Sequence, residues 1–372
     1  MALRLERLRE RTNGYTLTSR QYVLVAYCAL VALTLIVLTG AAVRLTDSGL
    51  GCPQWPECYG KLYPPLSTHA VIEFSNRVIS VPVVLAAGFA WLGALRRRPY
   101  RRDLVWLGAL LPIGVVCQAV LGGLTVRGKL DYGWVMGHFS LSMLILVAAT
   151  ALAWRAQYEP DRSRETLAFG AGRFGDAGRS GDARHRRVSP GFGGASVSPI
   201  GPRFGQRPRG GDRTLVWSAR ALVALGALTI FAGTAATAAG PHAGGNPGEP
   251  INRLDFHGRG TMDFVIHRHA EIAVAFGLLA LLVWWLARRR DADPAMRRST
   301  TLVCVLLALQ GAVGLDQYET HLPTELVWVH VGLACACWIA ALWTLYAAGR
   351  LPQRAPVVQE RPAPPPPVRV SA

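Results

Sequence analysis

The sequence predicts an all-α integral membrane protein in which eight transmembrane helices form two pseudo-symmetric four-helix bundles. Three observations lead to this prediction: long unbroken apolar blocks, arginines concentrated in alternate connections between the blocks, and an internal repeat of residue spacings. A helix needs about 20 consecutive apolar residues to cross the roughly 30 Å hydrocarbon core of a bilayer. A soluble domain spreads its apolar residues periodically, so these blocks indicate membrane spans.

Eight apolar blocks approach or meet the length that a span requires. The expected spans are 22–43, 74–95, 104–124, 134–154, 216–239, 264–287, 301–316 and 326–348. The seventh is the shortest and has room to extend toward Tyr318. The first block is too long for a cleaved signal peptide and lacks a small-residue cleavage site, so it is expected to remain as a span.

The placement of arginine predicts which side of the membrane each connection faces. The net charge of +17 comes almost entirely from Arg, because Lys occurs only at positions 61 and 129. The arginines flank the apolar blocks, which favours the positive-inside rule over nucleic-acid binding. The Arg-poor loops are 44–73, 125–133, 240–263 and 317–325. Both termini, which are Arg-rich, are therefore expected to be cytoplasmic.

The spans are expected to form two domains around a long polar linker. Residues 155–215 are rich in Gly, Arg, Ser and Pro. Such a segment cannot bury enough apolar surface to offset the entropy of ordering, so we expect a disordered cytoplasmic linker. It separates an N-terminal bundle (22–154) from a C-terminal bundle (216–348). Residues 1–21 form a cytoplasmic segment, and 349–372 form a Pro-rich cytoplasmic tail.

Matched spacings indicate that the two halves are related by a repeat. Three patterns recur in the same order: Gln118, Gly122 and His138 with Gln310, Gly314 and His330; Gly40 and Gly51 with Gly233 and Gly244; and Asn76-Arg77 with His267-Arg268. With four spans in each half, the repeats are parallel and related by an axis along the membrane normal.

Histidines gather at the bundle ends that face away from the cytoplasm. Of nine His, only His185 lies in the linker. His138, His330, His267 and His269 each lie a short distance inside a span. Two His on facing helices of a bundle can hold a metal or a haem, and single His far apart in sequence favour haem over bare Zn or Cu. The alternative is that these His only hydrogen-bond to neighbouring helices.

A carboxylate accompanies the single histidine of the first half. Asn76 stands where the second half has His267, and Glu73 lies three residues earlier, on the same helix face as Asn76. Glu73 has two interpretations: an ion pair with Arg77, or an acid/base or charge-stabilising group beside a substrate opposite His138. The asymmetry between the halves predicts a cofactor in the second bundle and a substrate in the first.

Two of the seven cysteines share a polar loop. Cys52 and Cys58 lie between Ser48 and Gly60, on the side expected to be oxidising, and the other five lie inside apolar blocks. Two Cys with five residues between them can form a disulfide there. The loop is then either a stapled lid or a redox-active thiol pair near the site.

Six stretches distributed over both halves carry a family pattern. They are Gly40-Ala-Ala-Val-Arg44-Leu-Thr-Asp-Ser-Gly49-Leu-Gly-Cys-Pro, Ile72-Glu73-Phe-Ser-Asn76-Arg77, Gln118-Ala-Val-Leu-Gly-Gly-Leu-Thr-Val126, Gly137-His138-Phe, Gly240-Pro-His242-Ala-Gly and Trp328-Val-His330. Together they resemble the haem A synthase family, membrane enzymes that oxidise a methyl group of haem O to the formyl group of haem A. The resemblance extends over essentially all eight spans.

The resemblance implies haem b as the cofactor of the C-terminal bundle, with haem O processed in the N-terminal bundle. The implied iron ligands of haem b are His330 and His267, with His269 as the alternative to His267. Glu73 is the implied catalytic residue. It also implies a Cys52–Cys58 disulfide. The expected substrate-haem residues are His138, Asn76 and Arg77.

The implied setting is a bacterial plasma membrane, with haem O synthase and a cytochrome oxidase assembly pathway as partners. The chain departs from the family pattern at Asn76, where Glu-x-x-His-Arg has a His. It also lacks a Cys pair in 240–263 and has a longer linker. The alternatives are a b-type electron-transfer cytochrome, which leaves Glu73 unexplained, and a haem or solute transporter, which predicts polar residues at the bilayer midplane.

Overall fold

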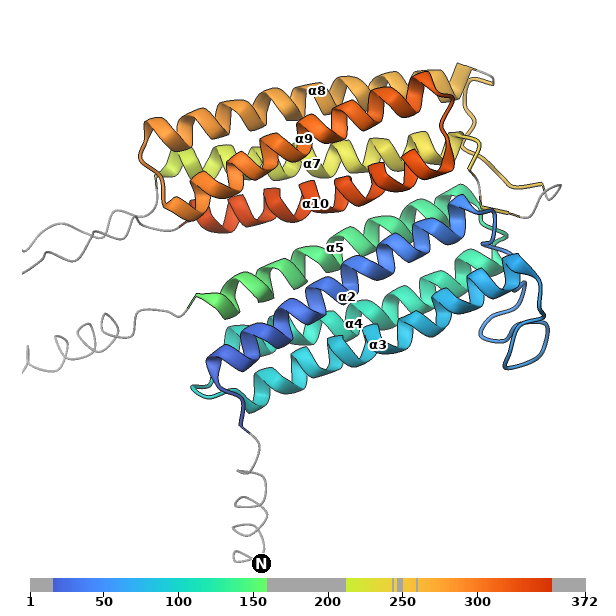
Figure 1. Ribbon diagram of the computed structural model, residues 1–372, viewed down its shortest axis with the longest axis horizontal. Coiled ribbons are helices and arrows are strands. Elements are labelled where there is room, and N and C mark those ends of the chain that lie inside the picture. Colours follow the sequence, from blue (N-terminus) through green and yellow to red (C-terminus); the bar gives the residue numbers. More distant parts are fainter. Residues whose placement is uncertain (1–15, 159–211, 243, 246–249, 259, 350–372) are drawn as a thin grey trace, which may run out of the picture. The chain divides into compact units, whose positions relative to one another are not determined.

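The computed structural model describes residues 16–158, 212–242, 244–245, 250–258 and 260–349 (Figure 1). Most of the predicted linker, the predicted tail after Gly349 and the first 15 residues lie outside the described residues. The described part contains eight helices that are long and apolar enough to cross a membrane. The protein is a multi-pass membrane protein, and the predicted all-α class is confirmed.

Each predicted span lies within one helix, and most helices extend several residues beyond it. The helices are α2 (Ser19–Leu45), α3 (Thr68–Arg96), α4 (Arg102–Arg127), α5 (Tyr132–Gln157), α7 (Arg213–Ala239), α8 (Gly260–Arg289), α9 (Pro294–Glu319) and α10 (Thr324–Ala348). The largest extension is at the start of α9, seven residues before the predicted span. Asp293 caps this end by accepting a hydrogen bond from Ala295 N, and Pro294 occupies the first turn. The helix continues through polar residues because its backbone hydrogen bonds do not require apolar side chains.

The helices form two four-helix bundles, as predicted. In the first, α2 packs on α3, α3 on α4, α4 on α5, and α5 closes the ring on α2. In the second, α7, α8, α9 and α10 contact one another in the same cyclic order. Residues 244–245 and 250–252 belong to the first bundle, where Gly244 O accepts a hydrogen bond from Gly49 N at 2.7 Å.

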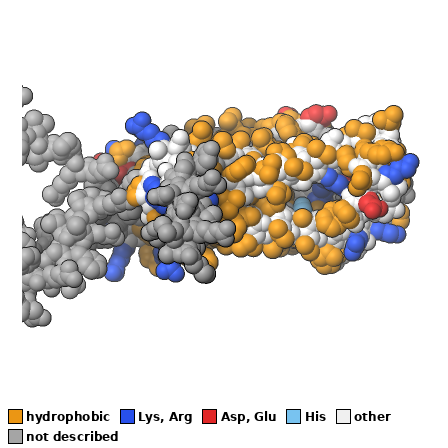
Figure 2. All heavy atoms as spheres, turned by 90° about the horizontal axis from the view of Figure 1, so that it is seen from below, with side chains coloured by type: hydrophobic (Ala, Val, Ile, Leu, Met, Phe, Trp, Pro, Cys, Tyr) orange, Lys and Arg blue, Asp and Glu red, His pale blue; other side chains and the backbone are white. Residues whose placement is uncertain are grey.

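Small residues line the helix interfaces, and large apolar residues face outward. Within the first bundle, a side chain at Gly108 would come within 3.1 Å of the Ala90 backbone, so α3 and α4 approach closely there. Lipid tails are as apolar as the helix surfaces, so the hydrophobic effect does not drive membrane helices together. Small residues instead let the backbones approach closely enough for van der Waals packing. Figure 2 shows hydrophobic side chains covering much of the visible face. The outward side chains include Leu24, Phe89 and Val116, all more than half exposed.

Candidate functional site

His269 on α8 and His330 on α10 lie opposite each other inside the second bundle. Their ring centroids are 6.2 Å apart, with the ring planes at 71°. His269 Nδ1 lies 3.0 Å from the backbone oxygen of Thr229 on α7, which orients the ring and leaves Nε2 for another partner. His330 Nδ1 is buried and has no hydrogen-bond partner among the described residues. A pair of imidazoles placed in this way could hold one iron atom between them.

Glycines on neighbouring helices make room for both imidazoles. A Cβ atom at Gly233 would lie 3.0 Å from His269 Cε1, and one at Gly314 would lie 3.2 Å from His330 Cε1. Both distances are shorter than ordinary van der Waals contact, so larger residues would push the rings away. The described residues contain no group of three or more His, Cys, Asp or Glu side chains placed to hold a metal ion.

His267, by contrast, faces away from His330. Its side chain is exposed, its Nδ1 lies 2.7 Å from the Asp263 backbone oxygen of its own helix, and its ring meets Tyr318 edge-on at 6.4 Å. Successive residues of a helix point about 100° apart, so His267 and His269 point to nearly opposite sides of α8. Of the two expected ligands on this helix, the structure brings His269 to His330.

His138 on α5 occupies the corresponding position in the first bundle. Its Cε1 atom would lie 3.2 Å from a Cβ at Gly122, and its buried Nδ1 has no hydrogen-bond partner in the described part of the chain. Gln118 Nε2 donates to the backbone oxygen of His138 at 3.1 Å. In the second bundle Gln310 Nε2 donates to the His330 oxygen, also at 3.1 Å. The spacing of twenty residues between Gln and His, which recurs in both halves, thus corresponds to a hydrogen bond between adjacent helices.

Asn76 is the structural counterpart of His269. Thr39 Oγ1 donates to Asn76 Oδ1 at 2.7 Å. Thr39 directly precedes Gly40, the residue whose repeat partner is Gly233, and His269 packs on Gly233. The polar–Arg pattern paired Asn76 with His267, whereas the 36 residues from Gly40 to Asn76 recur between Gly233 and His269.

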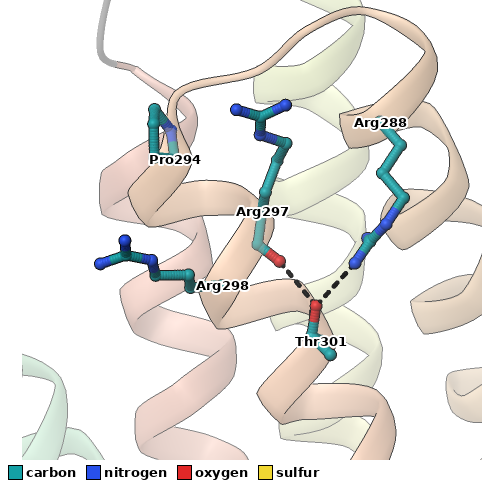
Figure 3. A pocket seen from close by; sticks show the side chains of 5 residues that line it. All are labelled: Arg288, Pro294, Arg297, Arg298 and Thr301. Atoms are coloured by element: carbon teal, nitrogen blue, oxygen red, sulfur yellow. Dashed lines mark hydrogen bonds between the residues drawn. The ribbon is translucent and has the colours of Figure 1, made fainter.

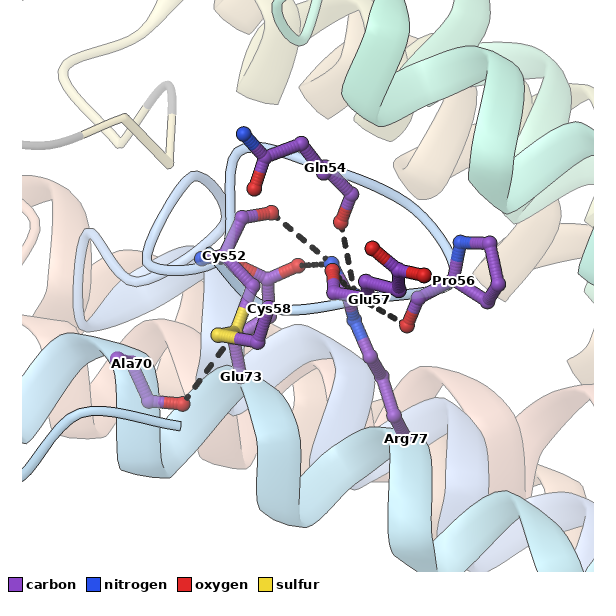
Figure 4. A network of polar contacts seen from close by, with 8 residues as sticks. All are labelled: Cys52, Gln54, Pro56, Glu57, Cys58, Ala70, Glu73 and Arg77. Carbon is purple, nitrogen blue, oxygen red and sulfur yellow. Dashed lines mark hydrogen bonds and ion pairs between the residues drawn. A yellow bond between two sulfur atoms is a disulfide. The ribbon is translucent and has the colours of Figure 1, made fainter. Parts of the chain in front are cut away.

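Glu73 lies at the start of α3 with both carboxylate oxygens engaged (Figure 4). It is 5% exposed, and its Oε2 accepts a hydrogen bond from Cys52 N at 2.6 Å. Its Oε1 accepts from Arg77 Nη2 in an ion pair. The ion pair considered from the sequence is therefore present, and the same carboxylate is also tied to the loop that carries Cys52.

Arg77 binds the backbone of that loop at four places. Its Nη1 donates to the carbonyl oxygens of Gln54, Pro56 and Glu57 at 3.0, 3.2 and 3.1 Å, and its Nη2 donates to the oxygen of Cys52 at 3.0 Å. A planar guanidinium with five N–H donors can serve several acceptors at once. One side chain thus fixes the loop and the Glu73 carboxylate together.

Cys52 and Cys58 form a disulfide, as expected. Their Cα atoms are 4.7 Å apart, and both residues are fully buried. They pack against Ala70 and Phe74 of α3. The disulfide-closed loop therefore covers the end of α3 that carries Glu73.

Comparison with known proteins supports these observations. The family described as cytochrome oxidase assembly protein (COX15-CtaA) matches residues 22–71 and 66–174. A protein of Shewanella oneidensis named Heme A synthase is 28% identical over 331 residues, covering 82% of this chain and 89% of that protein. One of Symbiobacterium thermophilum with the same name is 28% identical over 82% of this chain and 88% of its own length. The first bundle of this chain thus matches the COX15-CtaA family, and the two relatives named Heme A synthase are similar to the chain over 82% of its length.

The family match is concentrated on the first bundle. It includes Glu73, Arg77, His138 and both cysteines of the disulfide. A Heme A synthase of Lysinibacillus sphaericus reaches 36% identity, over only 37% of this chain and 45% of its own length. The Shewanella and Symbiobacterium relatives match 82% of this chain, which is more than the first bundle and the linker together contain, so their likeness extends into the second bundle.

Three residues of the sites carried no signal in the sequence. Thr39 and Thr229 act on Asn76 and His269 through hydrogen bonds across helices. Ser48, which is fully buried, lies 3.0 Å from His69 Nδ1 beside the disulfide loop. Hydroxyl residues are common in membrane helices and loops, so only the tertiary contacts single these three out.

Proposed function

We propose that this chain is a haem A synthase, which oxidises a methyl group of haem O to the formyl group of haem A. The observation that carries the proposal is the difference between the two bundles. The second bundle places two imidazoles opposite each other, and the first bundle has one imidazole together with a buried carboxylate. A permanent cofactor and an exchangeable substrate require such a difference. The family and the full-length relatives support the same activity.

The residues of the second bundle fit haem b as the cofactor, and His269 and His330 would hold its iron. The 6.2 Å between the ring centroids leaves room for one iron with imidazole–metal bonds of about 2 Å. The unpartnered Nδ1 of His330 and the glycines beside both rings support this assignment. Haem b in this position would supply electron transfer, while the protein fixes the two rings.

The first bundle binds the substrate haem, with His138 on its iron. Asn76 stands in the position of the second imidazole and is a much weaker ligand than imidazole, so the product can leave. Conversion of a methyl to a formyl group takes four electrons from the methyl carbon, breaks two of its C–H bonds and adds one oxygen atom, so the reaction needs an external electron acceptor and an oxygen donor. The Glu73 carboxylate stabilises the positive charge that develops and accepts a proton. Arg77 and Cys52 N hold the carboxylate in place for this role.

The proposed orientation places both termini in the cytoplasm and the disulfide loop outside, in the plasma membrane of a bacterium. The Arg-rich connections support it. Haem O synthase then supplies the substrate, and cytochrome oxidase assembly uses the product. A b-type cytochrome would need only the second bundle's imidazole pair, and a transporter would need polar groups at the bilayer midplane, so neither explains the held Glu73 carboxylate.

The decisive experiment combines spectroscopy with pigment extraction. The protein is purified and its haem spectrum recorded, and cells or membranes supplied with haem O are extracted to measure haem O and haem A. We expect a low-spin haem b spectrum and conversion of haem O to haem A. A stable haem b spectrum without any conversion would favour the cytochrome and contradict the proposal.

A further inference from the structure

We propose that the arginine-rich end of the α8–α9 hairpin binds the phosphate of an anionic phospholipid headgroup. A pocket of about 350 Å³ opens there between the last turn of α8 and the first turns of α9 (Figure 3). Its lining residues are Arg288, Pro294, Arg297, Arg298 and Thr301. Guanidinium groups bind phosphate through paired N–H donors, and three of them line this one pocket.

The positive charge of the pocket is largely uncompensated. Arg288 donates to Thr301 Oγ1 at 2.9 Å and stacks on the Trp284 ring at 3.8 Å, so neither of these partners is an acid. Arg297 pairs at 3.3 Å with Asp291, whose side chain is 93% exposed and contributes little in water. Arg298 takes part in none of the ion pairs found among the described residues. Arg288 and Arg298 thus line the pocket without a carboxylate partner among the described residues.

Apolar stripes below the pocket favour a lipid over free phosphate. On α8, Leu278, Leu281 and Trp285 lead up to Arg288 at spacings of three and four residues, and all three are 46–64% exposed.

On α9, Leu302, Val305 and Leu309 follow Arg298 at the same kind of spacing, and each is 51% exposed. Such spacings keep residues on one helix face. Each stripe thus ends at an arginine of the pocket. A phospholipid matches this pattern with acyl chains along the stripes and its phosphate at the arginines, whereas inorganic phosphate would use the pocket alone.

The test is native mass spectrometry of the full-length protein, released from detergent and titrated with phosphatidylglycerol, phosphatidylcholine or inorganic phosphate. The test variant is R288Q/R298Q. The matched control is R213Q/R220Q, which removes two exposed arginines of α7 in the same bundle that do not line the pocket. Both variants change the net charge equally.

We expect phosphatidylglycerol binding to weaken about tenfold in R288Q/R298Q and to change less than twofold in the control. Equal losses in both variants would show diffuse attraction and overturn the proposal. Equal binding of phosphatidylcholine would also overturn it, as would displacement of the lipid by millimolar inorganic phosphate. If the double variant does not fold, R298Q alone serves, since Arg298 makes no ion pair among the described residues, and it should weaken binding about threefold.

Discussion

At the scale of single residues, the direction in which a side chain points decides its chemistry. His267 and His269 are two positions apart on α8, yet one faces Tyr318 and the other faces His330. Glu73 could have been an exposed acid at a helix start, but it is buried with both oxygens bound. These orientations lead to two predictions about individual residues.

The first prediction concerns the ligands of haem b. H269A and H330A should each abolish the low-spin haem spectrum of the purified protein, because each removes one of the two facing imidazoles. H267A should retain the spectrum, since its ring lies on the exposed side of α8. The three spectra are recorded at equal protein concentration. Loss of the signal in H267A with retention in H269A would reverse the assignment.

The second prediction concerns Glu73. E73Q keeps the shape of the side chain and removes its charge, so we expect normal expression, retained haem b and a loss of haem A yield of about 100-fold or more. Pigment extraction measures the yield and detects a partly oxidised intermediate. E271Q is the control, because Glu271 pairs with Arg268 in a mostly exposed position. Wild-type haem A yield from E73Q would contradict the catalytic role, and loss of folded protein would favour a structural one.

At the scale of elements, the disulfide loop and α3 act as one unit. The disulfide closes the loop, and Arg77 binds four of its backbone carbonyls while also binding Glu73. The repeat partner Arg268 has no such role, since it pairs with Glu271 at 2.7 Å with both side chains more than half exposed. The loop is therefore a means of positioning the Glu73 carboxylate.

The third prediction tests Arg77 as a positioning residue. R77K keeps the positive charge, but a compact ammonium cannot serve four carbonyls and a carboxylate together. We expect faster proteolysis within residues 52–58 and about a tenfold lower haem A yield, with the haem b spectrum unchanged. R268K should affect neither, because an exposed ion pair contributes about 1 kcal/mol or less. An R77K protein with wild-type proteolysis and yield would remove this role.

At the scale of the whole molecule, the placement of arginine predicts the orientation of the chain in the membrane. The internal repeat provides two related bundles, one proposed for the substrate and one for the cofactor. Arginine is abundant in the connections at one end of the spans and scarce at the other. Each bundle closes the same ring of four helices. The two bundles differ at the position held by Asn76 in one and His269 in the other, and in the disulfide loop and the buried Glu73 of the first. The proposed division between substrate and cofactor rests on these differences.

The fourth prediction concerns orientation. Alkaline phosphatase fused after Lys61 should be active, because that loop is expected outside the cytoplasm, and a phosphatase fused after Asp291 should be inactive. A fluorescent protein after Asp291, after residue 182 or at the C-terminus should fluoresce. Phosphatase activity from a fusion at residue 182 would overturn the predicted topology.

Several features could be read from the sequence because they depend on local composition or spacing. The eight spans follow from the length of apolar blocks, which the thickness of the bilayer dictates. The relation between the bundles follows from repeated spacings, and the Gln118–His138 and Gln310–His330 hydrogen bonds account for one of them. The Cys52–Cys58 disulfide was expected as part of the family resemblance and is present.

Other features were decided only by the tertiary structure. Hydropathy places a span in the membrane but does not set its rotation about its axis, so the packing of α8 against α7 and α9 decides that His269, and not His267, points toward His330. Likewise, Arg77 binds backbone carbonyl groups of the loop. Every residue has such a group, so the sequence does not show which carbonyls will point toward the Arg77 guanidinium once the loop folds. Side-chain direction and loop conformation are long-range properties, and they arise when the helices pack.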